Sequence, residues 1–219
     1  VAGLALLLKP AGRISIEFPH LAQLITLNQF DTIYHEHFFF FFLIAINALL
    51  SRHRLTLVDV EQLPTHGGSL RIQIAHLGYQ PTHEAAQRID AVNRLEKTLK
   101  LDCLQTYQQY QAHIENTKNQ LLSFLIEAKN KGQTVVGYGA PAKGNTMLNF
   151  CGVGEGLLGY TVDISPHKQL LFLPGSCLTI FSTDQIFETK PAYVLILPWN
   201  LKEEIMEKMK DIAAWGGKF

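Results

Sequence analysis

The sequence predicts an α/β protein with two sheet-containing regions joined by a helical stretch. The first third of the 219 residues contains short apolar runs that alternate as strands do. The middle third carries apolar residues at helical spacing, and the last third alternates strand-like runs with helical segments. Apolar residues make up 47% of the chain, which is enough to bury a sizeable core.

Composition narrows the kinds of partner and compartment. Lys+Arg and Asp+Glu both number 19, so no excess of positive charge favours a nucleic-acid partner. Three isolated cysteines indicate neither a disulfide framework nor a zinc cluster, which favours a reducing, cytoplasmic location. The apolar start lacks the basic flank and cleavage site of a signal peptide, and residues 38–50 are too few to span a bilayer. We therefore expect both apolar runs to be core, and no membrane partner.

The first third reads as strand, helix, strand, tight turn and strand. A turn at residues 10–12 precedes a strand at 13–18, and residues 38–52 suit a buried helix. Residues 55–63 alternate as a strand, "THGGS" forms a turn, and "LRIQIAHL" alternates as the returning strand. The two last strands are therefore expected to form a hairpin.

The middle of the chain is expected to be helical from residue 81 to 131. One apolar face runs from Ala85 to Leu99, and a second seam steps by threes and fours from Leu104 to Leu125. Two heptad-like turns that include polar residues are too little for a functional coiled coil. We interpret this stretch as a connector between two domains.

The last third, residues 132–219, predicts a small Rossmann-like domain. Strand-like runs at 134–138, 159–163 and 192–199 alternate with helices, which implies parallel β-α-β units. Capping-box spacing at Ser182 and Gln185, and at Asn200 and Glu203, indicates two helix starts. The last strand of such a domain is expected to lie beyond "WGGKF".

The segment "GYGAPAKGN" lies between a predicted strand and a predicted helix. Gly137, Gly139 and Ala142 fit G-x-G-x-x-A, a pattern that lets backbone and a helix start approach phosphate oxygens. Asp163 ends the next strand, where a carboxylate can accept from ribose hydroxyls, and Lys143 adds a cation. On pattern alone the ligand is NAD; the alternative is a tight turn without a ligand.

The segment "YHEH" gathers Tyr34, His35, Glu36 and His37 directly before five phenylalanines. A histidine beside a carboxylate is a natural proton acceptor, because the carboxylate fixes the tautomer and stabilises the imidazolium. Two histidines that are two residues apart cannot share a helix face as zinc ligands spaced by four would, although they could bind zinc in an extended or turn geometry. No third ligand stands nearby in the sequence, so we favour a general base over a metal site and assign no metal ligand here. The alternative is a satisfied structural histidine. For "LPTHGGS", with His66, the pattern alone favours a plain hairpin turn.

Taken together, six segments resemble the SAM-dependent sugar C-methyltransferases, which act on nucleotide-linked keto-deoxysugars. They are, in order, "FDTIYHEH", "LPTHGGSLR", "GYGAPAKGNT", "YTVDISPHKQ", "LPG" and "VLILPWNLK" with "WGGKF". The resemblance covers almost the whole chain. It implies three modules, of which an N-terminal zinc module and the front half of a SAM-binding Rossmann domain lie outside this sequence. Residues 1–80 are then the end of the SAM domain, and the chain is a fragment.

The resemblance also implies roles for individual residues. His37 matches the family's base, which removes a proton from carbon beside a ketone so that the enolate takes the sulfonium methyl of SAM. Glu36 and Tyr34 would orient the sugar or the imidazole. The "GYGAPAKGN" loop would hold the nucleotide sugar rather than NAD, with Lys143 suited to diphosphate. Seven residues are expected to bind the substrate: His66, Ser69, Tyr138, Lys143, Asn145, Asp163 and Asn200.

Two departures from the family's pattern lie close to this segment. The family more often reads "HEHFSYFS", so Phe39, Phe40 and Phe42 replace smaller or polar residues and would overfill a packed core. Arg54 replaces a usual glycine at the end of the helix, where a left-handed conformation would be strained. These changes keep two alternatives open: a module that binds a nucleotide sugar or NAD without methylating, and an inactive truncated product.

Overall fold

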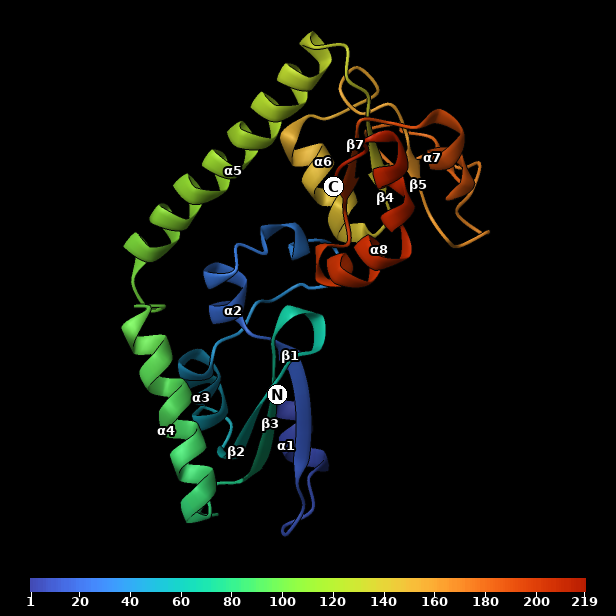
Figure 1. Cartoon of the computed structure of the whole chain (residues 1–219). Coiled ribbons are helices and arrows are strands. Elements are labelled where there is room, and N and C mark those ends of the chain that lie inside the picture. Colours follow the sequence, from blue (N-terminus) through green and yellow to red (C-terminus); the bar gives the residue numbers. More distant parts are fainter. The chain divides into compact units, whose positions relative to one another are not determined.

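The computed structural model describes residues 1–219, except for the side chain of His66. The chain forms two compact units, Val1–Gln29 with His37–His113, and Phe30–Glu36 with Ile114–Phe219. Figure 1 shows the elements of both, and the expected mixed α/β character is confirmed. Helix α5 (Leu104–Asn130) contributes to both units. The division into residues 1–80, 81–131 and 132–219 stays a prediction.

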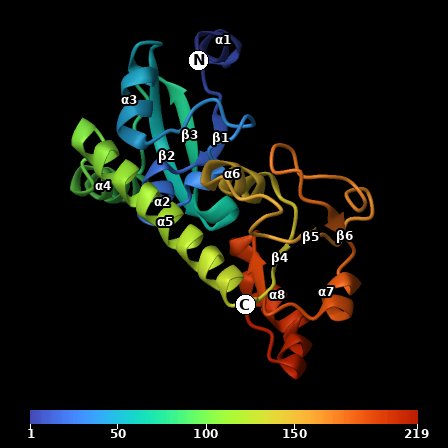
Figure 2. The same ribbon diagram turned by 90° about the horizontal axis from the view of Figure 1, so that it is seen from above.

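The first unit contains a three-stranded sheet with the order β1-β3-β2 (Figure 2). Its strands are β1 (Ile14–Pro19), β2 (Leu55–Leu63) and β3 (Ser69–His76), and β3 runs antiparallel to both neighbours. The three strands and the hairpin expected from the sequence are thereby confirmed. A 3₁₀ turn, η2 (Thr65–Gly67), joins the last two strands.

One face of this sheet is apolar and the other carries charge. The pairing of β2 with β3 shifts register between Leu57 and Asp59, so Val60 returns to the same apolar face as Leu57. Helices α3 (Leu43–Ser51) and α4 (His83–Thr98) contribute apolar side chains to that core. On the other face, cross-strand ion pairs of 3.2 Å join Arg71 to Glu17 and to Glu61. The helices α1 (Ala2–Leu7) and α2 (Leu21–Thr26) complete the unit.

The phenylalanine run does not continue a buried helix, so that expectation is wrong. Helix α3 begins only at Leu43, because the Glu96 carboxylate accepts the backbone N–H groups of Leu43 at 2.6 Å and Ile44 at 2.9 Å. Phe38 and Phe39 lie in irregular backbone and are 87% and 72% exposed. At these two positions a large ring overfills no core.

Arg54 adopts the left-handed conformation expected of the usual glycine, with φ of +54°. A non-glycine residue there carries backbone strain on the order of 1 kcal/mol. Its carbonyl accepts the Leu77 N–H at 2.8 Å, which holds the start of β2 beside the end of β3.

The second unit contains a parallel sheet with the order β6-β5-β4-β7. The strands are β4 (Val135–Tyr138), β5 (Thr161–Val162), β6 (Ile180–Phe181) and β7 (Tyr193–Ile196). The expected parallel β-α-β arrangement is confirmed. Strand β6 was missed, because two paired residues are too short for a periodicity.

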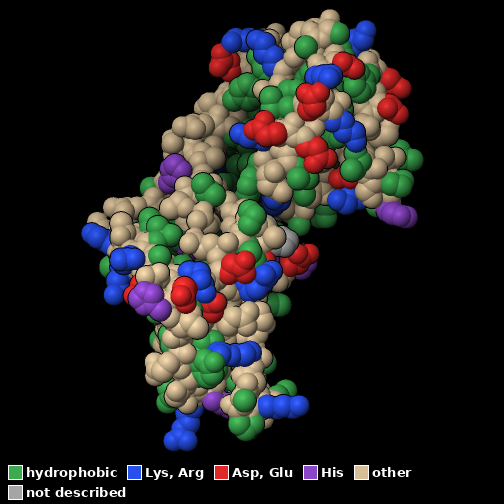
Figure 3. All heavy atoms as spheres, turned by 60° about the horizontal axis from the view of Figure 1, so that its bottom comes forward, with side chains coloured by type: hydrophobic (Ala, Val, Ile, Leu, Met, Phe, Trp, Pro, Cys, Tyr) green, Lys and Arg blue, Asp and Glu red, His purple; other side chains and the backbone are tan. Residues whose placement is uncertain are grey.

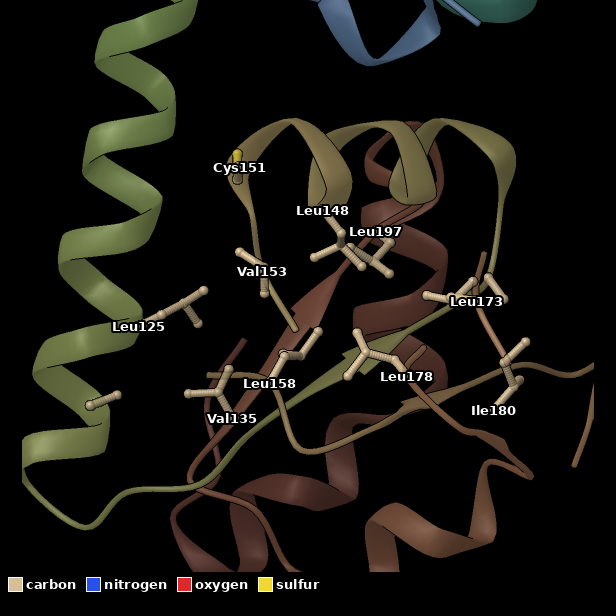
Figure 4. Close-up of a cluster of buried hydrophobic side chains, with 12 residues drawn as sticks. Leu125, Val135, Leu148, Cys151, Val153, Leu158, Leu173, Leu178, Ile180 and Leu197 are labelled. Carbon is tan, nitrogen blue, oxygen red and sulfur yellow. The ribbon is translucent and has the colours of Figure 1, made fainter. Parts of the chain in front are cut away.

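Helices cover both faces of this sheet. The carboxyl-terminal part of α5 and helix α6 (Ala142–Cys151) pack on one face, where Leu125, Leu148 and Leu197 are fully buried (Figure 4). Helices α7 (Asp184–Thr189) and α8 (Lys202–Lys208) and the 3₁₀ helix η4 (Lys210–Trp215) pack on the other. Strand β4 is therefore buried along its whole length, which explains its continuous apolar sequence.

The expected capping boxes are not formed. Helix α7 has Thr183 at its N-cap and α8 has Leu201, and neither start has a side-chain cap. A 3₁₀ turn, η3 (Trp199–Leu201), precedes α8 and holds Asn200 away from a capping position. Asn200 instead accepts a hydrogen bond from Lys143.

The distribution of surface charge and the length of the helices concern two kinds of partner, nucleic acids and membranes. On the face in Figure 3, acidic and basic side chains are interspersed rather than gathered into one stripe. Within the described part of the chain, no helix is both long and apolar enough to cross a bilayer.

Candidate functional site

The "YHEH" segment lies where the chain passes from one unit to the other. Tyr34, His35 and Glu36 belong to the second unit, and His37 belongs to the first. His35 is exposed, whereas His37 is half-buried with its ring edge-on to Phe40 at 6.0 Å between ring centroids. The segment is not helical and consists of turn and irregular backbone.

The second unit brings four polar or aromatic side chains together, which we call the Asp31–Lys143 cluster: Asp31, Lys143, Trp199 and Asn200. The short 3₁₀ helix η1 (Phe30–Thr32) carries Asp31, and its carboxylate accepts the Trp199 indole N–H at 2.7 Å. Lys143, in the first turn of α6, donates to Asn200 Oδ1 at 2.6 Å. Its ammonium group lies 4.4 Å from the centroid of the Trp199 ring, a cation–π distance.

Burial dominates the electrostatics of this cluster. Burial raises the pKa of Asp31 above its usual 3.8, although the Trp199 hydrogen bond and the charge of Lys143 act against the rise. Burial also lowers the pKa of Lys143, partly offset by Asp31. Both shifts favour the neutral forms, so the two groups are poised to gain from a charged or polar partner.

Tyr34 and Glu36 follow Asp31 in the same segment and interact with each other. Burial raises the pKa of the Tyr34 phenol, and the negative charges of Glu36 and Asp31 and a hydrogen bond with Glu36 add to the rise. Tyr34 therefore stays a protonated phenol that donates to the Glu36 carboxylate. This hydrogen bond holds the Glu36 carboxylate, and Glu36 directly precedes His37 in the sequence.

The glycines of "GYGAPAKGN" are required by packing within the second unit. A Cβ on Gly137 would lie 2.7 Å from Thr161 Oγ1, and one on Gly144 would lie 2.7 Å from Leu197 Cβ. Gly139 has φ of +90°, and a Cβ there would lie 2.6 Å from Pro198 Cδ. Packing contacts within the second unit thus explain the glycine pattern that suggested a dinucleotide loop.

Asp163 braces that loop from the end of β5. Its two carboxylate oxygens accept the N–H groups of Ala140 and Ser165, both at 2.8 Å. Lys168 donates to the Ala140 carbonyl at 3.0 Å and lies 3.4 Å from Asp163 Oδ2. Asp163 is 8% exposed, and its role toward a ribose stays a prediction.

Two further candidate residues of the second unit, Tyr138 and Asn145, differ in their surroundings and in their hydrogen bonding. Tyr138 is buried in the core beneath α8, and burial followed by the charges of Asp163 and Glu204 raises the pKa of its phenol. Asn145 sits in the first turn of α6, and its Oδ1 is buried without a hydrogen-bond partner among the described residues. Helix α6 starts at Pro141 without a side-chain cap, which leaves amide donors beside Lys143.

The first unit holds the other two expected substrate residues. Ser69 begins β3, is 2% exposed, and donates its hydroxyl proton to the Thr65 carbonyl at 3.2 Å. The side chain of His66 lies outside the described part of the structure. The expectation for both residues stays a prediction.

A cavity of the second unit lies at the opposite end of the parallel strands from this cluster. Its volume is about 490 Å³, and its lining includes Thr134, Val135, Gly159 and Tyr160 at the amino ends of β4 and β5. Ligands of parallel sheets bind at the carboxyl ends of the strands, which is where Lys143 and Asn200 lie. Volume alone therefore does not choose the site.

Comparison with known sequences identifies the family of this chain. The profile of a family described as "C-methyltransferase C-terminal domain" matches residues 64–219. The chain belongs to this C-methyltransferase family. A relative, C-methyltransferase NovU of Streptomyces niveus, is 35% identical over 217 residues, which are 99% of this chain and 51% of NovU. The chain therefore spans about half the length of the curated relative it matches, and the recognition of a sugar C-methyltransferase C-terminal portion is confirmed.

Sequence reasoning missed two members of the cluster. Asp31 stands in "FDTIYHEH" and Trp199 in "LPWNLK", but nothing in spacing links residues 168 positions apart. No local pattern in either segment marks these two residues as partners.

Proposed function

We propose that this chain is the carboxyl-terminal part of an enzyme that methylates a carbon beside the ketone of a nucleotide-linked deoxysugar. The observation that supports it best is the Asp31–Lys143 cluster, to which the segment "FDTIYHEH" contributes Asp31. The same short stretch thus supplies the proposed base, His37, and a buried carboxylate, Asp31. Asp31 accepts from the Trp199 indole, whose ring lies beside the Lys143 ammonium group. Family membership supports the reaction class.

The proposed chemistry begins with proton removal by His37. The C–H bond beside the ketone breaks, its proton moves to the imidazole, and the electron pair is delocalised onto the ketone oxygen as an enolate. The enolate carbon would then form a bond to the donor's methyl carbon while the methyl–sulfur bond breaks, and the electron pair of that bond would stay on the donor's sulfur. Tyr34 holds Glu36 by a hydrogen bond. The proposed role of Glu36, which directly precedes His37 in the sequence, is to stabilise the imidazolium that forms.

Substrate binding falls to the second unit. Lys143 and the uncapped start of α6 supply a positive charge and amide donors, which suit a diphosphate. Asn145 Oδ1 and the Asn200 amide are placed to bind the nucleoside or sugar. A diphosphate beside Lys143 would favour its charged form and reverse the effect of burial.

The methyl donor implied by the resemblance is SAM, which supplies an electrophilic sulfonium methyl. The acidic glycine-rich loop that the resemblance implies for SAM has no counterpart in residues 1–219, so no residue of this chain is assigned to it. We likewise assign no residue of this chain to zinc. We place the reaction in the cytoplasm.

The base role is tested by deuterium exchange, which needs no methyl donor. The chain is incubated in D₂O with a thymidine diphosphate-linked keto-deoxysugar, and deuterium at the carbon beside the ketone is followed by mass spectrometry. His37→Ala is expected to slow exchange by at least about a hundredfold, because a positioned base contributes that much. Calorimetric affinity for the sugar nucleotide should stay within about twofold.

His35→Ala is the matched control, since this exposed histidine is two residues away. Exchange at the wild-type rate in His37→Ala would refute the base role. Equal loss of binding and exchange would instead identify His37 as a structural residue.

A second candidate is a module that binds NAD or a nucleotide sugar without methylating. The strand, the left-handed Gly139 and the uncapped helix start favour it. Calorimetric titration with thymidine diphosphate and NAD in parallel separates the two. Saturable NAD binding without thymidine diphosphate binding would favour this alternative.

A further inference from the structure

The first unit contains a cavity of about 340 Å³ in which only Ser69 has been given an expected role. Its lining consists of His20, Gln23, Gln62, Leu63, Pro64, Gly67, Gly68 and Ser69. His20 directly follows β1, and Gln62 and Leu63 end β2. Because both strands run antiparallel to β3, their carboxyl ends meet at the same edge of the sheet. The cavity lies at this edge.

The ring of His20 is held by one buried carboxylate. His20 is 1% exposed, and its Nε2 lies 2.9 Å from Glu96 Oε1. Glu96 is fully buried and also accepts the N–H groups of Leu43 and Ile44. Because both Glu96 oxygens accept backbone N–H groups, we take Glu96 as the acceptor toward His20 and Nε2 as the nitrogen that donates.

The other ring nitrogen has no partner. His20 Nδ1 is buried and makes no hydrogen bond to any described residue. In the tautomer that Glu96 selects, Nδ1 presents a lone pair and is an acceptor. A buried acceptor without a hydrogen-bond donor is unfavourable, so a donating partner is expected here.

Ser69 has the same polarity. Its hydroxyl donates to the Thr65 carbonyl at 3.2 Å, so toward the cavity it offers only lone pairs. Two acceptors in one cavity select a ligand that donates, such as a hydroxyl or an amine. They disfavour phosphate and carboxylate groups, which only accept.

We propose that this cavity binds a hydroxyl-bearing part of the sugar substrate, with His20 Nδ1 and Ser69 Oγ as acceptors. The inference deepens the proposed function, on which it rests. The volume, against about 30 Å³ for one water molecule, leaves room for more than a bridging water. Glu96 is the positioning residue that keeps the required tautomer.

The structure offers a substitution that isolates the acceptor. In His20→Gln, the side-chain amide nitrogen takes the place of Nε2 and still donates to Glu96, while the acceptor at Nδ1 is lost. The contacts that start helix α3 are thereby retained. His76→Gln is the matched control: His76 Nε2 bonds the Leu8 carbonyl at 3.0 Å, and the residue lies at the other end of β3.

The test uses the whole chain with ¹⁵N-labelled histidine rings. Long-range ¹H–¹⁵N correlation spectra identify which ring nitrogen of His20 is protonated, before and after addition of thymidine diphosphate-glucose, thymidine diphosphate or free glucose. We expect an unprotonated Nδ1 that shifts with both glucose-containing probes and not with thymidine diphosphate. Calorimetry should show that the glucosyl group's gain in affinity falls about tenfold in His20→Gln and not in His76→Gln.

The outcomes separate this inference from the proposed function. If thymidine diphosphate-glucose binds but Nδ1 does not shift, the inference is wrong and the proposed function survives. If only free glucose shifts Nδ1, the cavity binds hydroxyl donors and the nucleotide-sugar function is wrong. A protonated Nδ1 in the free chain, or no response to any probe, overturns the inference.

Discussion

The first unit buries the carboxylate of Glu96 and the second unit buries that of Asp31, and the two differ in how many hydrogen bonds they accept. Glu96 in the first unit accepts from two backbone N–H groups and from His20. Asp31 in the second unit accepts one indole N–H, and burial outweighs its favourable surroundings enough to raise its pKa. A fully bonded carboxylate fixes structure, whereas an under-bonded one remains responsive to a ligand.

The largest effect is expected at Glu96. Glu96→Ala leaves the His20 ring and the N–H groups of Leu43 and Ile44 without their acceptor, which costs about 3–5 kcal/mol of the free energy of unfolding. Urea unfolding measures the loss. Glu127→Ala, at an exposed ion pair in α5, is the control and should change stability little. Equal effects at both positions would show that Glu96 is not a structural carboxylate.

A smaller effect is expected at Trp199. Trp199→Phe removes the N–H that Asp31 accepts, which costs about 1–3 kcal/mol. Trp215→Phe is the control, because that indole donates at 3.0 Å to the neutral Pro191 carbonyl. Chemical denaturation compares the two. A larger loss in Trp215→Phe would contradict a special role for the Asp31 contact.

The smallest effect is a change in pH dependence. Because the folded chain raises the pKa of Asp31, it binds this proton more tightly than the unfolded chain. The stabilisation is full below the usual pKa of 3.8 and is lost as pH rises through the raised folded value. Asp31→Asn should therefore gain stability relative to the wild type across this window.

Thermal midpoints of the two proteins over a series of pH values provide the measurement. Asn keeps an oxygen that accepts from Trp199, so the variant isolates the charge. A difference between the midpoints that does not change with pH would mean that Asp31 and Lys143 compensate each other fully.

These contrasts also show what sequence could and could not predict. The strands of the first unit alternate cleanly, and β4 reads as a continuous apolar run, so both sheets were predictable. The phenylalanine run was misread because apolar content was taken as burial, while Glu96, more than fifty residues on, fixes where α3 begins. The contact between Asp31 and Trp199 has no local signal, because only the tertiary fold brings the two together.

The segment Phe30–Glu36 has a consequence for dissecting this protein. It belongs to the second unit although the residues on both sides of it belong to the first, so the backbone crosses between the units more than once. Expressing residues 114–219 alone would uncover the Phe150 ring that Phe30 packs against and leave the Trp199 indole without its acceptor. A cloning boundary placed at a single linker thus cuts into a core. A second unit made in isolation requires these seven residues to be returned as a grafted extension or a synthetic peptide.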